Sequence, residues 1–201
     1  KKQTDEVYLD VLTEQLIDFG SKIILARQKF VQRLGYWANA LHQKISQEKE
    51  VLQINYLSNI PATCQTLQDI QQHFTHSLAQ VKERERFRHM TLVGPHRDDL
   101  DFLINDKNVQ TFGSQGQQRT TALSVKLAEI DLMKEETGEY PVLLLDDVMS
   151  ELDDSRQLHL LSTIEGKVQT FLTTTTLDHV KDKMSVEAEI FYVEQGHIKG
   201  E

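Results

Sequence analysis

Cysteine and long apolar runs are what the sequence most clearly lacks. Cys64 is the only cysteine among 201 residues, so no disulfide can form within the chain. No apolar run approaches the ~20 residues that a helix needs to cross a bilayer. We therefore expect a protein of a reducing cytoplasm that has no membrane among its partners.

An excess of positive charge is also absent. The chain has 22 Lys and Arg against 31 Asp and Glu, a formal net charge of −9. This charge argues against a strongly cationic nucleic-acid-binding surface over the whole chain, but it does not exclude a local basic patch, because binding depends on how the charge is distributed. The hydrophobic fraction of 39% is that of an ordinary globular chain. The first residues contain neither an initiator methionine nor a signal sequence, which indicates an excised segment.

The first part of the chain is mainly helical by its apolar spacing. Apolar residues recur every three or four positions from Tyr8 to Ile45, and predict a helix of ~60 Å at 1.5 Å per residue. Gly20 and Gly35 are weak points at which it could break into pieces. Residues 51–57 alternate like a strand, and residues 66–84 predict a second helix. We expect residues 1–88 to form a helical subdomain. A packed helix and a protruding coiled-coil arm both explain the unusual length of the first helix.

Two basic features lie close to residue 90. The densest basic cluster, Lys82–His89, could contact nucleic-acid phosphates, but a solvated helix end with internal ion pairs explains it equally well. A short strand is predicted at residues 90–93, followed by a Gly-Pro turn and a β-hairpin over residues 100–112. Arg97 lies in the turn and could contact phosphate or DNA. Pairing of Arg97 with a neighbouring aspartate is the structural alternative.

A strand that runs into two carboxylates organises the second half of the chain. Residues 142–145 are apolar and predict a strand buried on both faces of a parallel sheet. Asp146 and Asp147 follow at the carboxyl end of this strand, where ligands gather in open α/β sheets. A magnesium ion bearing nucleotide phosphates would compensate their like charges. The alternative is an ordinary core strand that continues into a polar loop.

A glycine-rich turn precedes a helix about thirty residues upstream. The turn reads Phe-Gly-Ser-Gln-Gly-Gln-Gln-Arg-Thr over residues 112–120. Ser114 is predicted to cap a helix that continues to about Glu136. Such a helix start presents its N–H groups and positive dipole end to an anion. A plain glycine turn would explain the glycines and the serine, but not the Gln-Gly-Gln-Gln run.

Together these segments resemble the motifs of ABC-type ATPases. Residues 113–118 resemble the signature motif, residues 143–147 the Walker B strand and residues 150–153 the D-loop. The Gly-Pro-His-Arg-Asp-Asp string at residues 94–99 resembles that of the RecF family, bacterial recombination mediators of the SMC-like group, and the whole chain resembles their C-terminal part. The resemblance implies an α/β fold in which residues 89–201 form the C-terminal lobe of an ABC-type ATPase head, with a P-loop NTPase-like sheet and flanking helices.

The resemblance also implies roles for single residues at the nucleotide. Asp146 would hold Mg²⁺, and Asp147 would orient the attacking water as the catalytic residue. Four signature residues would bind ATP from the opposite head of a dimer, and these are Ser114, Gln115, Gly116 and Gln117.

Further residues take roles around that nucleotide. In the D-loop, Ser150 and Asp153 would link the two sites of the dimer. Many relatives place a histidine at the switch position, which here falls on a threonine, Thr174 or Thr175. Arg119, on the signature helix, is with Arg97 a possible contact of phosphate or DNA.

The phosphate loop of nucleotide-binding proteins is missing, because no Gly-x-x-x-x-Gly-Lys-Ser/Thr string occurs in the sequence. The resemblance assigns that loop to the N-terminal part of a longer protein, so the segment alone is expected to be inactive or nearly so. The intact protein is expected to serve DNA repair, recombination and replication at the bacterial nucleoid. It would dimerise with ATP and Mg²⁺, hydrolyse ATP slowly, and bind DNA junctions and other recombination mediators.

Other functions stay open at this point. A non-enzymatic helical interaction module would use the same acids structurally. Another SMC-like ATPase head would share the three motifs. A self-contained metal phosphohydrolase would use Asp146 and Asp147 directly.

Overall fold

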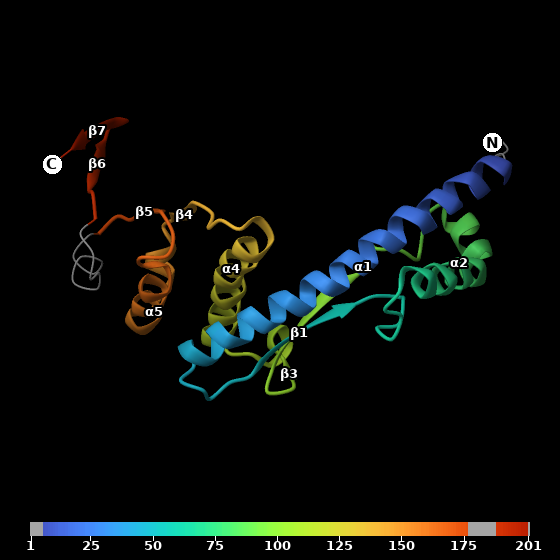
Figure 1. Ribbon diagram of the computed structural model, residues 1–201, viewed down its shortest axis with the longest axis horizontal. Helices are drawn as coiled ribbons and strands as arrows, with labels where there is room; N and C mark the ends of the chain where they lie inside the picture. Colours follow the sequence, from blue (N-terminus) through green and yellow to red (C-terminus); the bar gives the residue numbers. More distant parts are fainter. Residues whose placement is uncertain (1–5, 177–187, 201) are drawn as a thin grey trace. The chain divides into compact units, whose positions relative to one another are not determined.

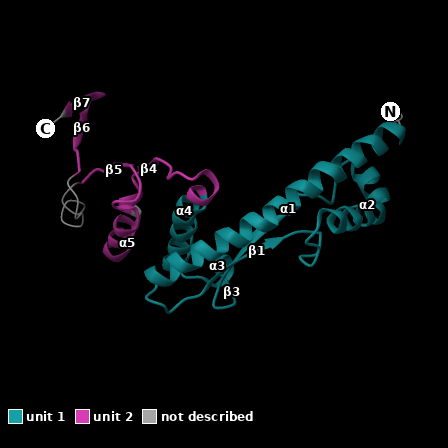
Figure 2. Cartoon of the chain, viewed as in Figure 1, with its two compact units in different colours: residues 1–132 teal, residues 133–201 magenta. Residues whose placement is uncertain are grey.

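The computed structural model describes residues 6–176 and 188–200, in which the chain forms two compact units (Figure 2). Unit 1 comprises residues 1–132 and unit 2 residues 133–201. The helices and small sheets confirm the predicted α/β class. The boundary expected near residue 88 falls inside unit 1, because strands from both sides of it pair with each other. Within the described residues, no helix has both the length and the apolar character that a membrane span requires.

Helix α1, Glu6–Ile45, is a single helix of 40 residues, as its apolar spacing predicts. It packs against strand β1 and helix α2 of the same unit (Figure 1). A Cβ atom on Gly20 would lie 2.6 Å from Phe74 Cε1, so the glycine allows α2 to approach α1 closely. The buried hydrophobic residues of α1 are Ile24, Val31, Leu34, Ala38 and Leu41.

Helix α2, Leu67–Arg88, begins at the N-cap Thr66, whose hydroxyl accepts from Asp69 N at 3.1 Å. Its buried face joins one hydrophobic cluster. The members of this cluster are Ile24, Ile60, Cys64, Ile70, Phe74, Leu78 and Val93.

The basic end of α2 forms ion pairs with the beginning of α1. Arg86 Nη2 lies 3.1 Å from Glu6 Oε1, and Lys82 Nζ lies 3.4 Å from Asp10 Oδ1. Glu6, Asp10 and Lys82 are exposed and Arg86 is partly exposed, so each pair contributes little to stability. For these two cations, the geometry favours the ion-paired helix end over a free phosphate-binding cluster.

Strands β1, Leu52–Leu57, and β2, Asp99–Ile104, form an antiparallel pair with Leu52 opposite Ile104. Strand β3, Lys107–Asn108, adds only two residues to this sheet. The return strand expected over residues 109–112 is wrong, because Val109–Phe112 forms helix α3. The Asn108 side chain caps this helix by accepting from Thr111 N at 2.8 Å, which turns the chain away from the sheet.

The strand expected at residues 90–93 is also wrong, since these residues form an irregular segment. Side chains occupy the backbone groups that a strand ladder would use. Leu92 N donates to Glu85 Oε1 at 2.6 Å, and Thr91 O accepts from the guanidinium of Arg97. Val93 is buried in the cluster under α2 without strand pairing.

Unit 2 contains the predicted strand β4, Leu143–Asp146, paired in parallel with β5, Thr170–Thr173. Helix α5, Asp154–Ile164, connects them after the short 3₁₀ helix η1, Val148–Glu151. Strands β6, Phe191–Glu194, and β7, His197–Gly200, form an antiparallel hairpin. All these elements are labelled in Figure 1 except the short η1.

Strand β4 is not buried on both faces as predicted. Leu144 is 73% exposed, and its register partner Phe171 on β5 is 55% exposed. Parallel strands bury both faces only when other layers cover both sides of the sheet. The described residues of unit 2 leave the face that carries Leu144 and Phe171 open.

Candidate functional site

Helix α4, Gln115–Thr137, begins directly after Ser114, as predicted. Ser114 Oγ accepts from Gln117 N at 3.2 Å, and Ser114 N donates to Gln117 Oε1 at 2.9 Å. The two residues therefore form a reciprocal capping box. Gly113 is required before them, since a Cβ there would lie 2.4 Å from Val109 O.

The exposed N-terminus of α4 can accept an anion. Ser114 and Gln115 are exposed, and the first turn carries no acidic side chain. The N–H groups of a first turn lack carbonyl partners within the helix, and the helix dipole places positive charge there. Gly116 lies in this turn, and Arg119 adds an exposed cation less than two turns further along. A phosphate is the ligand that this arrangement suits best.

A polar network joins α4, the helix that the signature motif is predicted to begin, to the end of α1. Gln117 Nε2 donates to Glu50 Oε1 at 2.9 Å, and Glu50 Oε2 lies 2.9 Å from His42 Nε2. His42 Nδ1 lies 3.3 Å from Ser124 Oγ on α4. Burial lowers the pKa of His42 below its ordinary value, and this effect outweighs the opposing hydrogen bond and charge of Glu50. Sequence reasoning missed His42 and Glu50, because neither belongs to a recognisable motif.

Asp146 lies at the carboxyl end of β4, as predicted, and its side chain is exposed. Thr173 Oγ1 donates to Asp146 Oδ1 at 2.6 Å and accepts from Asp147 N at 3.0 Å. Asp147 has a left-handed backbone with φ 50°, which ends the strand and turns the chain. Thr173 was also missed, since the sequence does not reveal which of four consecutive threonines lies opposite Asp146.

The D-loop residues are held by local hydrogen bonds. Ser150 Oγ donates to Asp147 O at 2.9 Å. Asp153 caps α5 by accepting from Arg156 N at 3.0 Å, and it also forms an ion pair with the Arg156 guanidinium. These local bonds stabilise the loop between β4 and α5.

The switch candidates lie directly after β5. The Thr174 hydroxyl bonds to the backbone of Thr176, accepting from its N at 3.3 Å and donating to its O at 3.0 Å. Thr175 is exposed. Of the threonines in this run, the structure brings Thr173 to Asp146 and holds Thr174 in a turn.

The loop that contains Arg97 is pinned from two sides. The guanidinium of Arg97 donates to Thr91 O, from Nε at 3.1 Å and from Nη2 at 2.9 Å. Asp98 accepts a short hydrogen bond from the hydroxyl of Tyr56 on β1. Burial, and then the bond to Asp98, raise the pKa of Tyr56 to about 12. Two nitrogens of the Arg97 guanidinium therefore already donate hydrogen bonds that hold the loop.

The residues present fit magnesium and a nucleotide phosphate. Exposed carboxylate oxygens such as those of Asp146 are the ligands that Mg²⁺ prefers. In the described part of the chain, no three His, Cys, Asp or Glu side chains cluster as a complete metal site. A cation at Asp146 would thus take its remaining ligands from phosphate, water or other parts of a larger protein.

Known proteins resemble the chain over nearly its full length. The DNA replication and repair protein RecF of Enterococcus faecalis is 64% identical over 201 residues, which cover 99% of this chain and 54% of that protein. RecF of Latilactobacillus sakei is 54% identical over 198 residues, covering 98% and 53%. No protein-family model matches. The chain spans about half the length of the two RecF relatives.

Solved structures agree with the sequence relatives. The recombination mediator protein RecF in the RecFOR pathway, solved as RecF-ATPrS, superposes with a TM-score of 0.85 at 34% identity and matches 99% of this chain and 52% of its own. The structure of RecF-ATP in the same pathway gives a TM-score of 0.82 at 34% identity, over 98% and 51%.

Proposed function

The chain belongs to the RecF family as its C-terminal part, and on this premise we propose that it supplies the signature helix and the Walker B strand of an ATP-dependent DNA repair protein. The intact protein would act in the bacterial cytoplasm at the nucleoid, on DNA and with other recombination mediators. The observation that carries the proposal is the exposed capping box of Ser114 and Gln117 at the N-terminus of α4. The orientation of Asp146 by Thr173 supports it.

Bound ATP would supply a triphosphate whose charge is shared with Mg²⁺. Ser114 suits the γ-phosphate of a nucleotide carried by a second copy, because its oxygen accepts in the cap and its hydroxyl hydrogen stays available. The first-turn amides at Gln115 and Gly116 would add backbone donors. The site would thus be complete only when two copies face each other.

Unit 2 would contribute the acids. Asp146 would hold the Mg²⁺, in an orientation set by the hydroxyl of Thr173. Asp147 would orient the attacking water, and its side chain, shorter than that of a glutamate, suits slow turnover. Ser150 and Asp153 would link the two sites of the dimer. Thr174 and Thr175 follow β5 directly and are the candidates for the switch position.

Such a protein would act as a timing device on DNA. ATP would stabilise the closed dimer, because only the closed form provides both halves of each site. Hydrolysis would then release the dimer. The segment alone contains no phosphate loop in its sequence, so we expect it to hydrolyse ATP poorly or not at all.

The substitution Ser114→Arg in the full-length protein tests this function. The long cation removes the serine donor and fills the space in front of α4, so ATP-dependent dimerisation, measured by analytical ultracentrifugation, should be lost. Ser162→Arg, at an exposed serine of α5, is the control and should dimerise like the unchanged protein. Dimerisation that survives Ser114→Arg unaltered would show that this helix does not bind nucleotide in trans.

A further inference from the structure

We infer that Glu50 and His42 are positioning residues for the signature serine, which they reach through Gln117. The inference rests on the proposed role of Ser114 and extends it to a segment outside every recognised motif. Glu50 lies between α1 and β1, 67 residues from Gln117 in sequence. All four residues belong to unit 1.

Both polar atoms of the Gln117 side chain form hydrogen bonds. Its Oε1 accepts from Ser114 N at 2.9 Å, while its Nε2 donates to Glu50 Oε1 at 2.9 Å. An amide that is bonded at both ends cannot rotate without losing one of its partners. Glu50 therefore fixes the orientation of the side chain that closes the cap around Ser114.

Glu50 is itself held in place by His42. Its other oxygen, Oε2, lies 2.9 Å from Nε2 of His42, whose side chain is fully buried. The opposite ring nitrogen of His42 lies 3.3 Å from Ser124 Oγ, two turns further along α4. His42 thus bonds directly to α4 and, through Glu50, to its first turn. A buried polar group without partners would be costly, so the structure favours the arrangement in which His42 keeps its bonds to Glu50 and Ser124.

The hydrogen-bond network runs from the interior of unit 1 to the solvent. It starts at a fully buried imidazole, passes through the partly buried Glu50 and ends at the exposed Ser114. The cap therefore does not depend on Ser114 and Gln117 alone. A change at the end of α1 alters the donor and acceptor directions of the signature loop.

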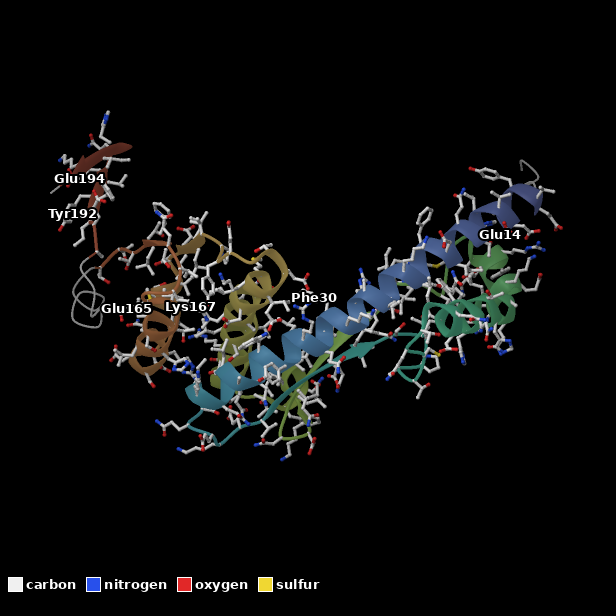
Figure 3. The ribbon with its side chains drawn as sticks, in the orientation of Figure 1. Glu14, Phe30, Glu165, Lys167, Tyr192 and Glu194 are labelled. Carbon is white, nitrogen blue, oxygen red and sulfur yellow. The ribbon has the colours of Figure 1, made fainter. Side chains whose placement is uncertain are left out.

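The test compares Glu50→Ala with Glu50→Gln in the full-length protein. Alanine frees the Gln117 amide, so the dissociation constant of the ATP-dependent dimer should rise about tenfold, equivalent to ~1.4 kcal/mol. ATP affinity of the dilute monomer should not change, because the monomer binds nucleotide on its own phosphate loop. Amide hydrogen exchange at Ser114 should become faster. Glu14→Gln, on the exposed part of α1 (Figure 3), is the matched control and should change none of these quantities.

The Glu50→Gln variant separates geometry from charge. Its amide can still accept from Gln117 through Oε1 and can donate to the Nε2 atom of His42, so dimerisation should stay within about twofold of the unchanged protein. If Glu50→Gln loses as much as Glu50→Ala, the charge of Glu50 matters and positioning is refuted. Should Glu50→Ala not fold, Glu50→Asp replaces it, because the shorter carboxylate cannot bridge both partners.

The outcomes for the inference and for the proposed function are distinct. If the unchanged protein does not dimerise with ATP, the proposed function is wrong, and Ser114 amide exchange still decides whether Glu50 positions the cap. If the unchanged protein dimerises and Glu50→Ala changes neither dimerisation nor exchange, the positioning role is wrong while the proposed function stands.

Discussion

Thr173 Oγ1 lies 2.6 Å from Asp146 Oδ1, across the parallel pair of β4 and β5. A hydroxyl that donates to a carboxylate at this distance forms a charge-assisted bond, stronger than one between neutral groups. The same oxygen accepts from Asp147 N, so one side chain sets the direction of the Asp146 carboxylate and of the backbone after it.

Thr173→Val should therefore impair catalysis more than folding. Valine keeps the shape of threonine but cannot orient Asp146, and we expect ATP hydrolysis by the full-length protein to fall about tenfold, the lower end of what loss of a hydrogen-bond partner of a metal ligand costs. Steady-state ATPase assays over a range of Mg²⁺ concentrations measure this. Thr173→Ser keeps the hydroxyl and should retain most activity. Equal activity of the valine and serine variants would remove Thr173 from the site.

Ser114 has two functions that substitution can separate. Ser114→Ala removes the cap and should lower the free energy of unfolding by about 1 kcal/mol, measured by urea denaturation of the chain. Ser114→Asp restores a capping oxygen and should restore stability. An aspartate carries no hydrogen for a phosphate and adds a negative charge, so ATP-dependent dimerisation of the full-length protein should be lost. A dimerising Ser114→Asp protein would contradict the assigned phosphate contact.

Acid should destabilise unit 1 through His42. Burial lowers the pKa of His42 in the folded chain, while the unfolded chain keeps the ordinary value of 6.5. As the pH falls below about 6.5, the unfolded state takes up a proton that the folded state resists, so stability is lost down to the folded pKa. His42→Gln does not titrate, and its amide can still bond to Glu50. Melting temperatures between pH 7.5 and 5 should thus depend less on pH in this variant than in the unchanged chain.

Alkali should act on Tyr56 in the opposite range. The folded pKa of about 12 lies above the ordinary 10.0, so the unfolded chain ionises first as the pH rises. The stability that Tyr56 contributes is complete below about pH 10 and is lost as the pH approaches 12. Tyr56→Phe should flatten this loss in thermal melts, whereas Tyr36→Phe, at an exposed tyrosine of α1, should not. Identical profiles for the two variants would contradict the shift.

The parts of the fold that follow from local pattern were predictable. The three- and four-residue spacing of α1, the Ser114 cap and the strand before Asp146 all depend on neighbouring residues, and the structure confirms them. The failures at residues 90–93 and 109–112 have a different origin. There, side chains of Glu85, Arg97 and Asn108 bond to backbone groups that a strand would need.

The candidate site was predictable only where it consists of contiguous motif residues. Thr173 is opposite Asp146 because of strand register, and a run of identical threonines carries no information about register. Glu50 meets Gln117 because α1 returns through a turn and β1 before the chain reaches α4. Contacts over such sequence separations depend on the assembled unit, and no local pattern encodes them.

Helix α1 is so long that a small tilt would move its far end appreciably. At 1.5 Å per residue its 40 residues extend over ~60 Å, so a tilt of one degree about one end displaces the other by ~1 Å. Ion pairs tie its first turns to α2, and His42 lies in its last turn. A change of a few tenths of an ångström already weakens a hydrogen bond. A displacement of α2 that tilts α1 would therefore change the strength of the hydrogen bonds that hold Gln117 near the other end of the helix.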